Sequence, residues 1–235
     1  MNATKFAGVR AFSMTPTRLG SGTTDIALSQ KLQEELKFEQ EAAAETAAPD
    51  TTPEFLKSFL EQGVWSIEDV RGNDEVALTR KFGDENLRVV FSIADIAVED
   101  EFEDPEAQPE EDDAETVLAT PIRTSVSITK STGPGALNID LTAQDNAFTV
   151  ENISFYDDAK VGTELTAEAD WKRRGLYIGP SFETLDYTLQ EEFQKYLAER
   201  GLNEIVASFI PEYAAYKEQQ EYVKWLGKVK NFVDL

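Results

Sequence analysis

Between residues 64 and 156 the sequence is a series of short segments in which apolar and polar residues alternate. In the segment 87–93 every second residue is large and apolar, so these side chains share one face of an extended chain. Turn sequences rich in glycine, asparagine and aspartate separate the segments, and such short connections join antiparallel strands. The region therefore predicts an antiparallel meander. We expect about seven strands, at 64–70, 75–82, 87–93, 121–130, 136–142, 147–156 and 171–178.

Helical patterns flank the strand region on both sides. Residues 25–41 repeat leucine every four positions, and residues 217–233 carry a wider apolar stripe. Each stripe needs a partner, so we expect the two terminal helices to pair in the manner of a coiled coil. The order helix, strands, helices predicts an α+β fold. The residues expected to pack the helices and to support an oligomer are Leu28, Leu32, Leu36, Tyr222, Trp225, Leu226, Val229 and Phe232.

The helices near the C-terminus carry recognisable end signals. Gly201 follows the helical pattern of residues 182–199, where a left-handed cap belongs, and Asn203 is placed to cap the next helix. Pro211 is expected to break or kink that helix, because proline cannot donate the helical hydrogen bond. The residues that this helix is expected to bury are Ile205, Val206, Phe209 and Ile210.

The composition excludes several kinds of chemistry. The chain has 45 acidic and 22 basic residues, a formal net charge of −23, and neither cysteine nor histidine. Disulfides, zinc–thiolate sites and serine–histidine or cysteine–histidine nucleophiles are therefore impossible. The charge repels nucleic acid and favours basic protein partners. Direct membrane insertion is not expected, because no apolar run approaches the ~20 residues that span a bilayer.

The first 19 residues differ from the rest, because they contain three basic residues and no acid. This composition is typical of a mitochondrial transit peptide, with an ordinary flexible terminus as the alternative. The sequence RAFS at 10–13 resembles a processing site, and the mature chain would begin at Ser13 or Gly20. We expect residues 1–19 to direct the protein to the mitochondrial matrix and residues 20–235 to form one acidic domain.

Residues 99–115 contain eleven carboxylates and no positive charge. Such a segment buries too little apolar area to offset the entropy of ordering, so we expect a disordered acidic loop at about 99–116. A flexible polyanion attracts basic proteins at long range, with fast and salt-sensitive binding. A gain in solubility alone is the alternative. The residues expected to bind partners are Glu99, Asp100, Glu101, Glu103, Asp104, Glu110, Glu111, Asp112, Asp113 and Glu115.

Enzymatic and metal-binding interpretations are weaker. Hydrolases use paired carboxylates, and Asp140 and the pair Asp157-Asp158 are candidates, although a solvated strand face or a turn explains each more simply. Residues 157–162 lack the third ligand of a calcium loop, so a specific calcium site is not expected there. Weak, diffuse binding of divalent cations by residues 99–115 is the remaining possibility. The basic cluster at 172–174 is expected to pair with the protein's own acids. We therefore expect no catalytic residue, no cofactor and no specific metal site.

Three stretches near the C-terminus form a recognisable pattern: LAERG at 197–201, EQQEYVKWL at 218–226 and KNFV at 230–233. They resemble the ending of the mitochondrial acidic matrix protein family, also called the mitochondrial glycoprotein or complement component 1 Q subcomponent-binding protein family. Weaker matches are LRVVFSI (87–93) and TRKF (79–82). This resemblance implies a twisted antiparallel sheet, an N-terminal helix packed against the C-terminal one, and a ring-shaped homotrimer. A short helix at 53–62 and Pro211 depart from the family pattern.

The resemblance also implies a function. Family members are mitochondrial matrix proteins without a known enzymatic reaction, and they bind basic partners and support mitochondrial ribosome function, translation and respiratory-chain maintenance. We therefore expect a homotrimeric, non-enzymatic acidic scaffold or chaperone of the matrix. Its partners would be basic proteins, such as mitochondrial ribosomal or imported proteins. A carboxylate-based hydrolase and a low-affinity divalent-cation buffer are the alternatives.

Overall fold

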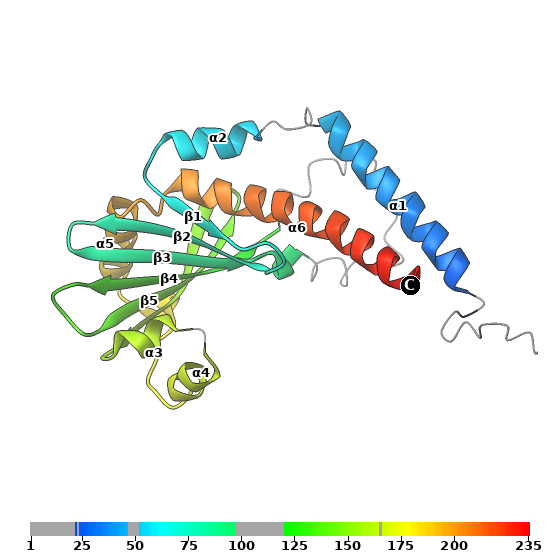
Figure 1. Ribbon diagram of the computed structural model, residues 1–235. Helices are drawn as coiled ribbons and strands as arrows, with labels where there is room; N and C mark the ends of the chain where they lie inside the picture. The colour runs from blue at the N-terminus through cyan, green and yellow to red at the C-terminus, as the bar shows by residue number, and fades with distance from the viewer. Residues whose placement is uncertain (1–21, 23, 47–51, 97–119, 165) are drawn as a thin grey trace, which may run out of the picture.

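The computed structural model describes residues 22, 24–46, 52–96, 120–164 and 166–235 (Figure 1). The expected transit peptide at 1–19 and the expected acidic loop at 99–116 lie outside the described residues, so both stay predictions. The described part is one antiparallel sheet with helices on both faces, which confirms the expected α+β class.

The sheet has six strands, and each strand pairs with the next one along the chain. Tight turns make this meander possible. Gly72 and Gly83 adopt positive φ after β1 and β2, and Asp145 and Asn146 both adopt positive φ in the two-residue turn between β5 and β6. The strands are β1 (Ser66–Asp69), β2 (Glu75–Phe82), β3 (Glu85–Ser92), β4 (Ile122–Lys130), β5 (Ala136–Gln144) and β6 (Ala147–Tyr156).

The strand expected at 171–178 is wrong. Residues Ala167–Arg173 instead form helix α4, which the side chain of Thr166 caps. Ala169 of this helix is buried, and acidic and basic residues one turn apart pair on its exposed surface, an arrangement that an alternating strand does not have. Past this helix, a β-bridge between Asn152 and Ser181 joins the chain to β6, and Asn152 and Ser154 also donate hydrogen bonds to the carbonyl of Ile178.

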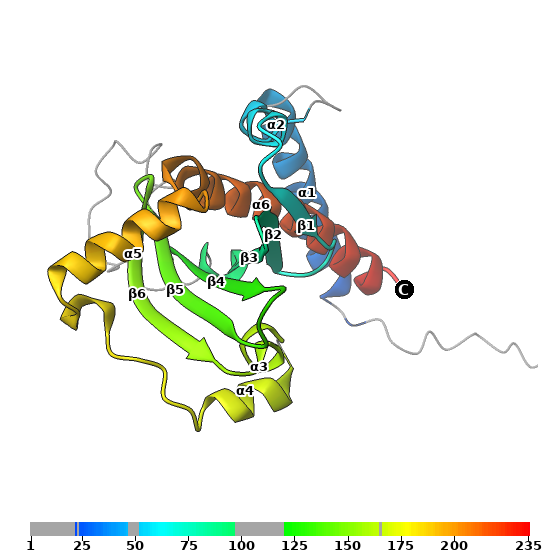
Figure 2. The ribbon, with the colours of Figure 1, turned by 90° about the vertical axis from the view of Figure 1, so that its left-hand side faces the viewer.

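Helix α6 (Glu204–Val233) crosses one face of the sheet and continues past its edge, where α1 (Asp25–Thr46) packs against it (Figure 1). The two terminal helices therefore pair as expected. Figure 2 shows the two layers: α6 lies on one face of the sheet, while the short helices α3 (Ala159–Thr163) and α4 lie on the other. The remaining helices are α2 (Glu54–Glu61), the 3-10 helix η3 (Phe182–Thr184) and α5 (Tyr187–Glu199).

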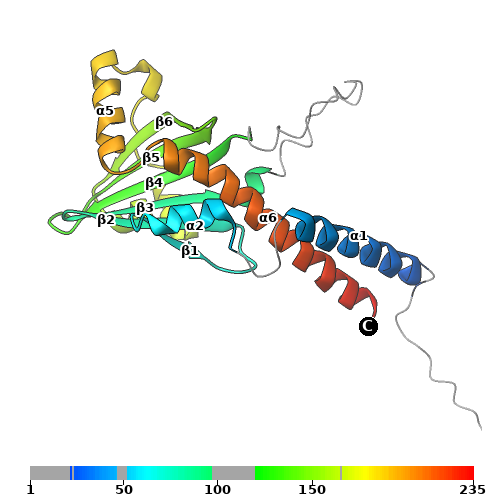
Figure 3. The ribbon, with the colours of Figure 1, turned by 90° about the horizontal axis from the view of Figure 1, so that it is seen from above.

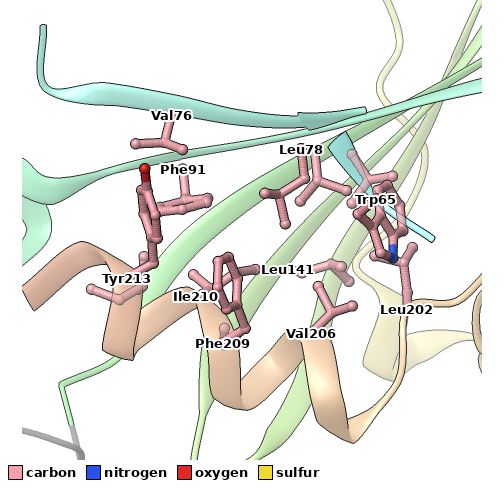
Figure 4. Close-up of a cluster of buried hydrophobic side chains, with 14 of the residues drawn as sticks. Trp65, Val76, Leu78, Phe91, Leu141, Leu202, Val206, Phe209, Ile210 and Tyr213 are labelled. Atoms are coloured by element: carbon pink, nitrogen blue, oxygen red, sulfur yellow. The ribbon is translucent and has the colours of Figure 1, made fainter. Parts of the chain in front are cut away.

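The hydrophobic core lies between the sheet and the first half of α6 (Figure 4). Ile210 of α6 and Leu78 of β2 have no exposed surface, and Leu141 of β5 is 1% exposed. On the outer side of α6, Phe59 of α2 stacks on Phe209 with ring centroids 3.6 Å apart. Since burying a side chain of this size contributes ~1.5–3 kcal/mol, these contacts fix α6 on the sheet.

Pro211 does not break α6, so the expected break is wrong. The helix is continuous from Glu204 to Val233, and Asn203 caps its start by accepting hydrogen bonds from two backbone N–H groups. Pro211 is buried where the helix meets the core, and tertiary packing outweighs the hydrogen bond that proline cannot donate. Val206, Phe209 and Ile210 are buried as expected, whereas Ile205 is 49% exposed.

Two buried ion pairs fasten the last two helices to the sheet. Glu85 at the start of β3 is 3% exposed and accepts hydrogen bonds from Arg200 Nε (2.6 Å) and Nη2 (3.1 Å), directly after α5. Lys217 in the middle of α6 is also 3% exposed and donates to Asp69 of β1. The hydroxyl of Tyr213 donates to the same aspartate over 2.9 Å. Together these bonds fix the direction of α6 across the sheet.

Candidate protein-binding surface

Helix α1 and residues 218–233 of α6 form an antiparallel pair that extends past the sheet (Figure 3), here called the terminal helix pair. Hydrogen bonds between side chains fix the register of the two helices. Residue numbers rise along α1 while those of the bonded partners fall along α6, so the helices are antiparallel. These bonds join Ser29 Oγ to Asp234 Oδ1 (2.6 Å), Tyr222 OH to Glu35 Oε1 (3.3 Å) and Gln219 Nε2 to Glu39 Oε2 (2.7 Å).

The apolar seam of the terminal helix pair is thin. Among its described side chains, Leu32 is buried on α1 and Leu226 on residues 218–233 of α6. Leu36 and Val229 are half-buried, and Leu28 is 48% exposed. Such a seam removes little apolar surface from water, so it holds the two helices together more weakly than the core holds the sheet.

An aromatic stripe on α6 stays uncovered beside this seam. Trp225 is 54% exposed and Phe232 is 77% exposed, and they lie two turns apart on the same side of the helix. The ring of Tyr222 stacks on Trp225 at a centroid distance of 6.1 Å. The stripe expected from the sequence is therefore wider than α1 alone covers. Exposed apolar surface of this kind marks a site of protein contact.

Helix α1 gives the terminal helix pair an excess of negative charge. It carries six acidic residues and two lysines, which leaves four uncompensated negative charges. The lysines pair with Glu34 and Glu41 in exposed ion pairs, and such pairs contribute little to stability. Ile26 and Phe38 are 73% and 65% exposed among these acids. The terminal helix pair thus presents carboxylates and apolar side chains together.

The described residues on either side of the segment 97–119 lie at the end of the sheet nearest the terminal helix pair. Asp95, which precedes this segment, accepts hydrogen bonds from the backbone N–H (2.8 Å) and Nη2 (2.6 Å) of Arg123, which follows it. Strand register places Arg123 at the same end of the sheet as Asp69. Asp69 binds Lys217, directly before the part of α6 that pairs with α1.

A second apolar surface lies at the opposite end of the molecule, beyond β6 and around α4 and α5 (Figure 1). Tyr177 is 81% exposed, Trp171 76% and Tyr187 71%. The strand expected at 171–178 would have paired these residues within the sheet, so the sequence did not indicate an exposed surface there. The available signal was the run of large apolar residues at 176–178, which neither alternates nor follows a helical period. Phe155, Leu176, Ile178 and Leu189 are also exposed there.

The carboxylates considered for catalysis occupy separate places. Asp140 lies on the sheet face opposite α6 and accepts a hydrogen bond from Ser125 (3.3 Å). Partial burial raises the pKa of Asp140, and the nearby charge of Glu151 adds to this shift. Asp158 caps α3 by accepting a hydrogen bond from the backbone N–H of Lys160 (2.9 Å), which is a structural role.

The basic cluster at 172–174 pairs internally, as expected. Lys172 binds Glu168 (2.8 Å), and Arg174 binds Asp170 (2.8 Å). Arg173 donates to backbone carbonyls of α3 and the residue after it. Within the described residues there is no group of three or more acidic side chains placed to hold a metal ion, and no helix long and apolar enough to cross a membrane.

The fold and these surfaces define a class: an acidic α+β protein whose exposed features suit contacts with other proteins. Comparison with known proteins gives the family. The sequence model of the mitochondrial glycoprotein family matches residues 32–233, so the chain belongs to this family. The family resemblance seen in the sequence is thereby confirmed.

Individual relatives agree with this assignment. The chain is 39% identical over 183 residues to the mitochondrial acidic protein mam33 of Schizosaccharomyces pombe, covering 72% of this chain and 68% of that protein. It is 28% identical to the mitochondrial complement component 1 Q subcomponent-binding protein of Bos taurus, covering 73% and 62%. A solved Leishmania major protein of unknown function, described as a homologue of human p32, aligns with a TM-score of 0.64 and 27% identity, covering 88% and 98%.

Proposed function

We propose that this protein is a non-enzymatic acidic scaffold or chaperone of the mitochondrial matrix that binds basic proteins. The observation that carries the proposal is the terminal helix pair, on which uncompensated carboxylates and exposed aromatic side chains lie together. Charge of this sign accelerates encounter with cationic partners, and the apolar side chains then supply contact area. We propose that the eleven carboxylates at 99–115 add to this field, because the described residues that flank positions 97–119 lie at the same end of the sheet as Asp69.

We further propose that the protein assembles as a ring-shaped homotrimer. Two different apolar surfaces support this: the stripe of Trp225 and Phe232, and the surface around Tyr177 and Tyr187. They lie at opposite ends of the molecule (Figure 1). Contact between two unlike surfaces of identical chains is head-to-tail, and such an interface forms a ring when its rotation closes. Sedimentation equilibrium of the full chain would measure the mass of the assembly, which should be three times that of one chain.

The proposed cellular role follows from the family. The relatives from fission yeast and cattle carry mitochondrial names, and the bovine one is named for binding a complement subcomponent. Residues 1–19 have the composition of a transit peptide. We propose that the basic partners are mitochondrial ribosomal or imported proteins, and that their binding supports mitochondrial ribosome function, translation and respiratory-chain maintenance.

A salt series tests the proposed function. Affinity for a lysine-rich protein is measured between about 0.05 M and about 0.5 M ionic strength, a range over which the screening length falls severalfold. We expect the affinity to fall steeply as the salt concentration rises. Affinity that does not change with salt would contradict the charge mechanism. A matched acidic protein of similar size serves as the control partner and should not bind at any salt concentration.

A further inference from the structure

The sheet face opposite α6 carries a concave site of a different chemical character. Its volume is about 430 Å³, within the range of small-ligand sites. Two rows of side chains cross the strands here, because residues paired in register point to the same side of the sheet. One row is Ser66, Thr79, Arg88 and Ser127, and the next is Lys81, Asn86 and Thr129.

Most polar groups of this site are unused within the described part of the chain. The side chains of Ser66, Thr79, Asn86, Ser127 and Thr129 make no hydrogen bond to any described residue. Lys81 forms no ion pair with any described carboxylate. Thr163 of α3 closes one side of the site, and its hydroxyl donates to a backbone carbonyl (2.8 Å). Several donors thus converge on one concavity without a partner from the described chain.

The charge of the site is opposite to that of the whole molecule. Lys81 and Arg88 line it, and the described residues of its lining include no carboxylate, although the chain has a net charge of −23. Glu68 lies on the neighbouring row and accepts a hydrogen bond from Arg88 Nη1. That ion pair is exposed on both sides, 41% and 54%, so a ligand anion competes with Glu68 for the guanidinium.

We propose that this concavity binds the phosphoryl group of a small, water-soluble phosphorylated molecule. A phosphoryl group presents three oxygens and up to two negative charges, which match hydroxyl donors, an ammonium and part of a guanidinium at once. A single carboxylate would leave most of these donors unused. The described lining includes no aromatic side chain on which a nucleobase could stack. The ligand class is therefore a phosphate ester without a recognised base. This site is separate from the proposed protein-binding surface.

The full chain and pyrophosphate, used as a probe, test the proposal by isothermal titration calorimetry. Lys81→Gln should weaken binding roughly tenfold, because a charge-assisted contact is lost. Glu68→Gln should strengthen binding, because it frees Arg88 from its competing carboxylate. Lys195→Gln on α5, whose lysine pairs with Glu192 away from this face, is the matched control and should leave binding unchanged.

A neutral variant and two further ligands test the same site. Thr129→Val removes one donor without changing charge and should weaken binding several-fold while the fold, followed by circular dichroism, is retained. Absence of pyrophosphate binding by the wild-type chain, or equal loss in Lys195→Gln and Lys81→Gln, would overturn the proposal. Glycerol 3-phosphate and vesicles containing phosphatidic acid show whether the bound phosphoryl group belongs to a soluble ester or to a lipid headgroup. Binding to vesicles alone would overturn the assignment to a soluble ligand.

Discussion

The two halves of α6 differ in what covers them. In the first half, Val206, Ile210 and Ala214 are buried against the sheet, and Lys217 is buried in an ion pair. In the second half Leu226 is the buried residue, while Trp225 and Phe232 face outward. One helix therefore has two tasks. Its first half stabilises the fold, and its second half holds α1 and leaves aromatic side chains uncovered.

The largest effect should come from the first half. Ile210→Ala creates a cavity at a fully buried position, and the expected loss of unfolding free energy is in the upper part of the ~2–5 kcal/mol range for such changes. Urea denaturation measures it. The matched control is Ile205→Ala in the same helix, which is 49% exposed and should cost less than ~1 kcal/mol. Equal losses would contradict the burial difference.

The next effect concerns the ion pair in the middle of α6. Lys217→Met keeps the apolar stem but leaves Asp69 without its cation. Because Asp69 is 27% exposed, the expected cost lies somewhat below the ~3–5 kcal/mol of breaking a fully buried pair. Lys228→Met, at an exposed position of the same helix, is the control. Similar denaturation midpoints for the two variants would show that the pair does not hold the helix.

A smaller, pH-dependent effect concerns Glu85, beside the start of α6. The hydrogen bond from Arg200 lowers the pKa of Glu85 below its ordinary value. A lowered folded-state pKa contributes stability above the ordinary value of ~4.3, and this contribution is lost as the pH falls through the folded pKa. Glu85→Gln should therefore destabilise the protein at neutral pH, and the difference from wild type should shrink in acid.

The urea denaturation midpoints of wild type and Glu85→Gln are compared at pH 7 and at about pH 3, which lies below the ordinary carboxyl pKa. Glu75→Gln in the neighbouring strand serves as the control, because Glu75 is exposed. A wild-type advantage over Glu85→Gln that is equally large at both pH values would contradict the linkage.

The smallest effect on the isolated chain should come from the second half. Trp225→Ala is expected to change unfolding free energy by less than ~1 kcal/mol, because the side chain is 54% exposed. The same change should lower the mass seen in sedimentation, since the stripe supports the proposed trimer. Unchanged mass in both Trp225→Ala and Phe232→Ala would remove this stripe from the interface.

The sequence predicts the parts of this fold that depend on local periodicity. Strand β3 is a clear case, because Leu87, Val89 and Phe91 alternate with more exposed residues and are bounded by turns. The helix at Ala167–Arg173 was missed because seven residues give too short a period to distinguish from an apolar strand segment. The expected break at Pro211 was wrong for the opposite reason: the core contacts that retain the helix come from residues far away in the sequence.

The candidate site was harder to predict than the fold. Its stripe of Tyr222, Trp225 and Phe232 is visible in the sequence, but which side chains α1 covers depends on the register of two helices far apart in the chain. The pairing of Lys217 with Asp69 joins residues 148 positions apart, and nothing local specifies it. The rows that line the concavity around Lys81 likewise exist only once four strands are in register.

The central claim is that clustered negative charge captures cationic proteins without any reaction. The most direct test replaces the ten acidic residues named at Glu99–Glu115 by their amides and measures the affinity of a lysine-rich protein at low and at high ionic strength. We expect a large loss of affinity at low salt and convergence of variant and wild type at high salt, where charges are screened. Equal affinities at every salt concentration would contradict it.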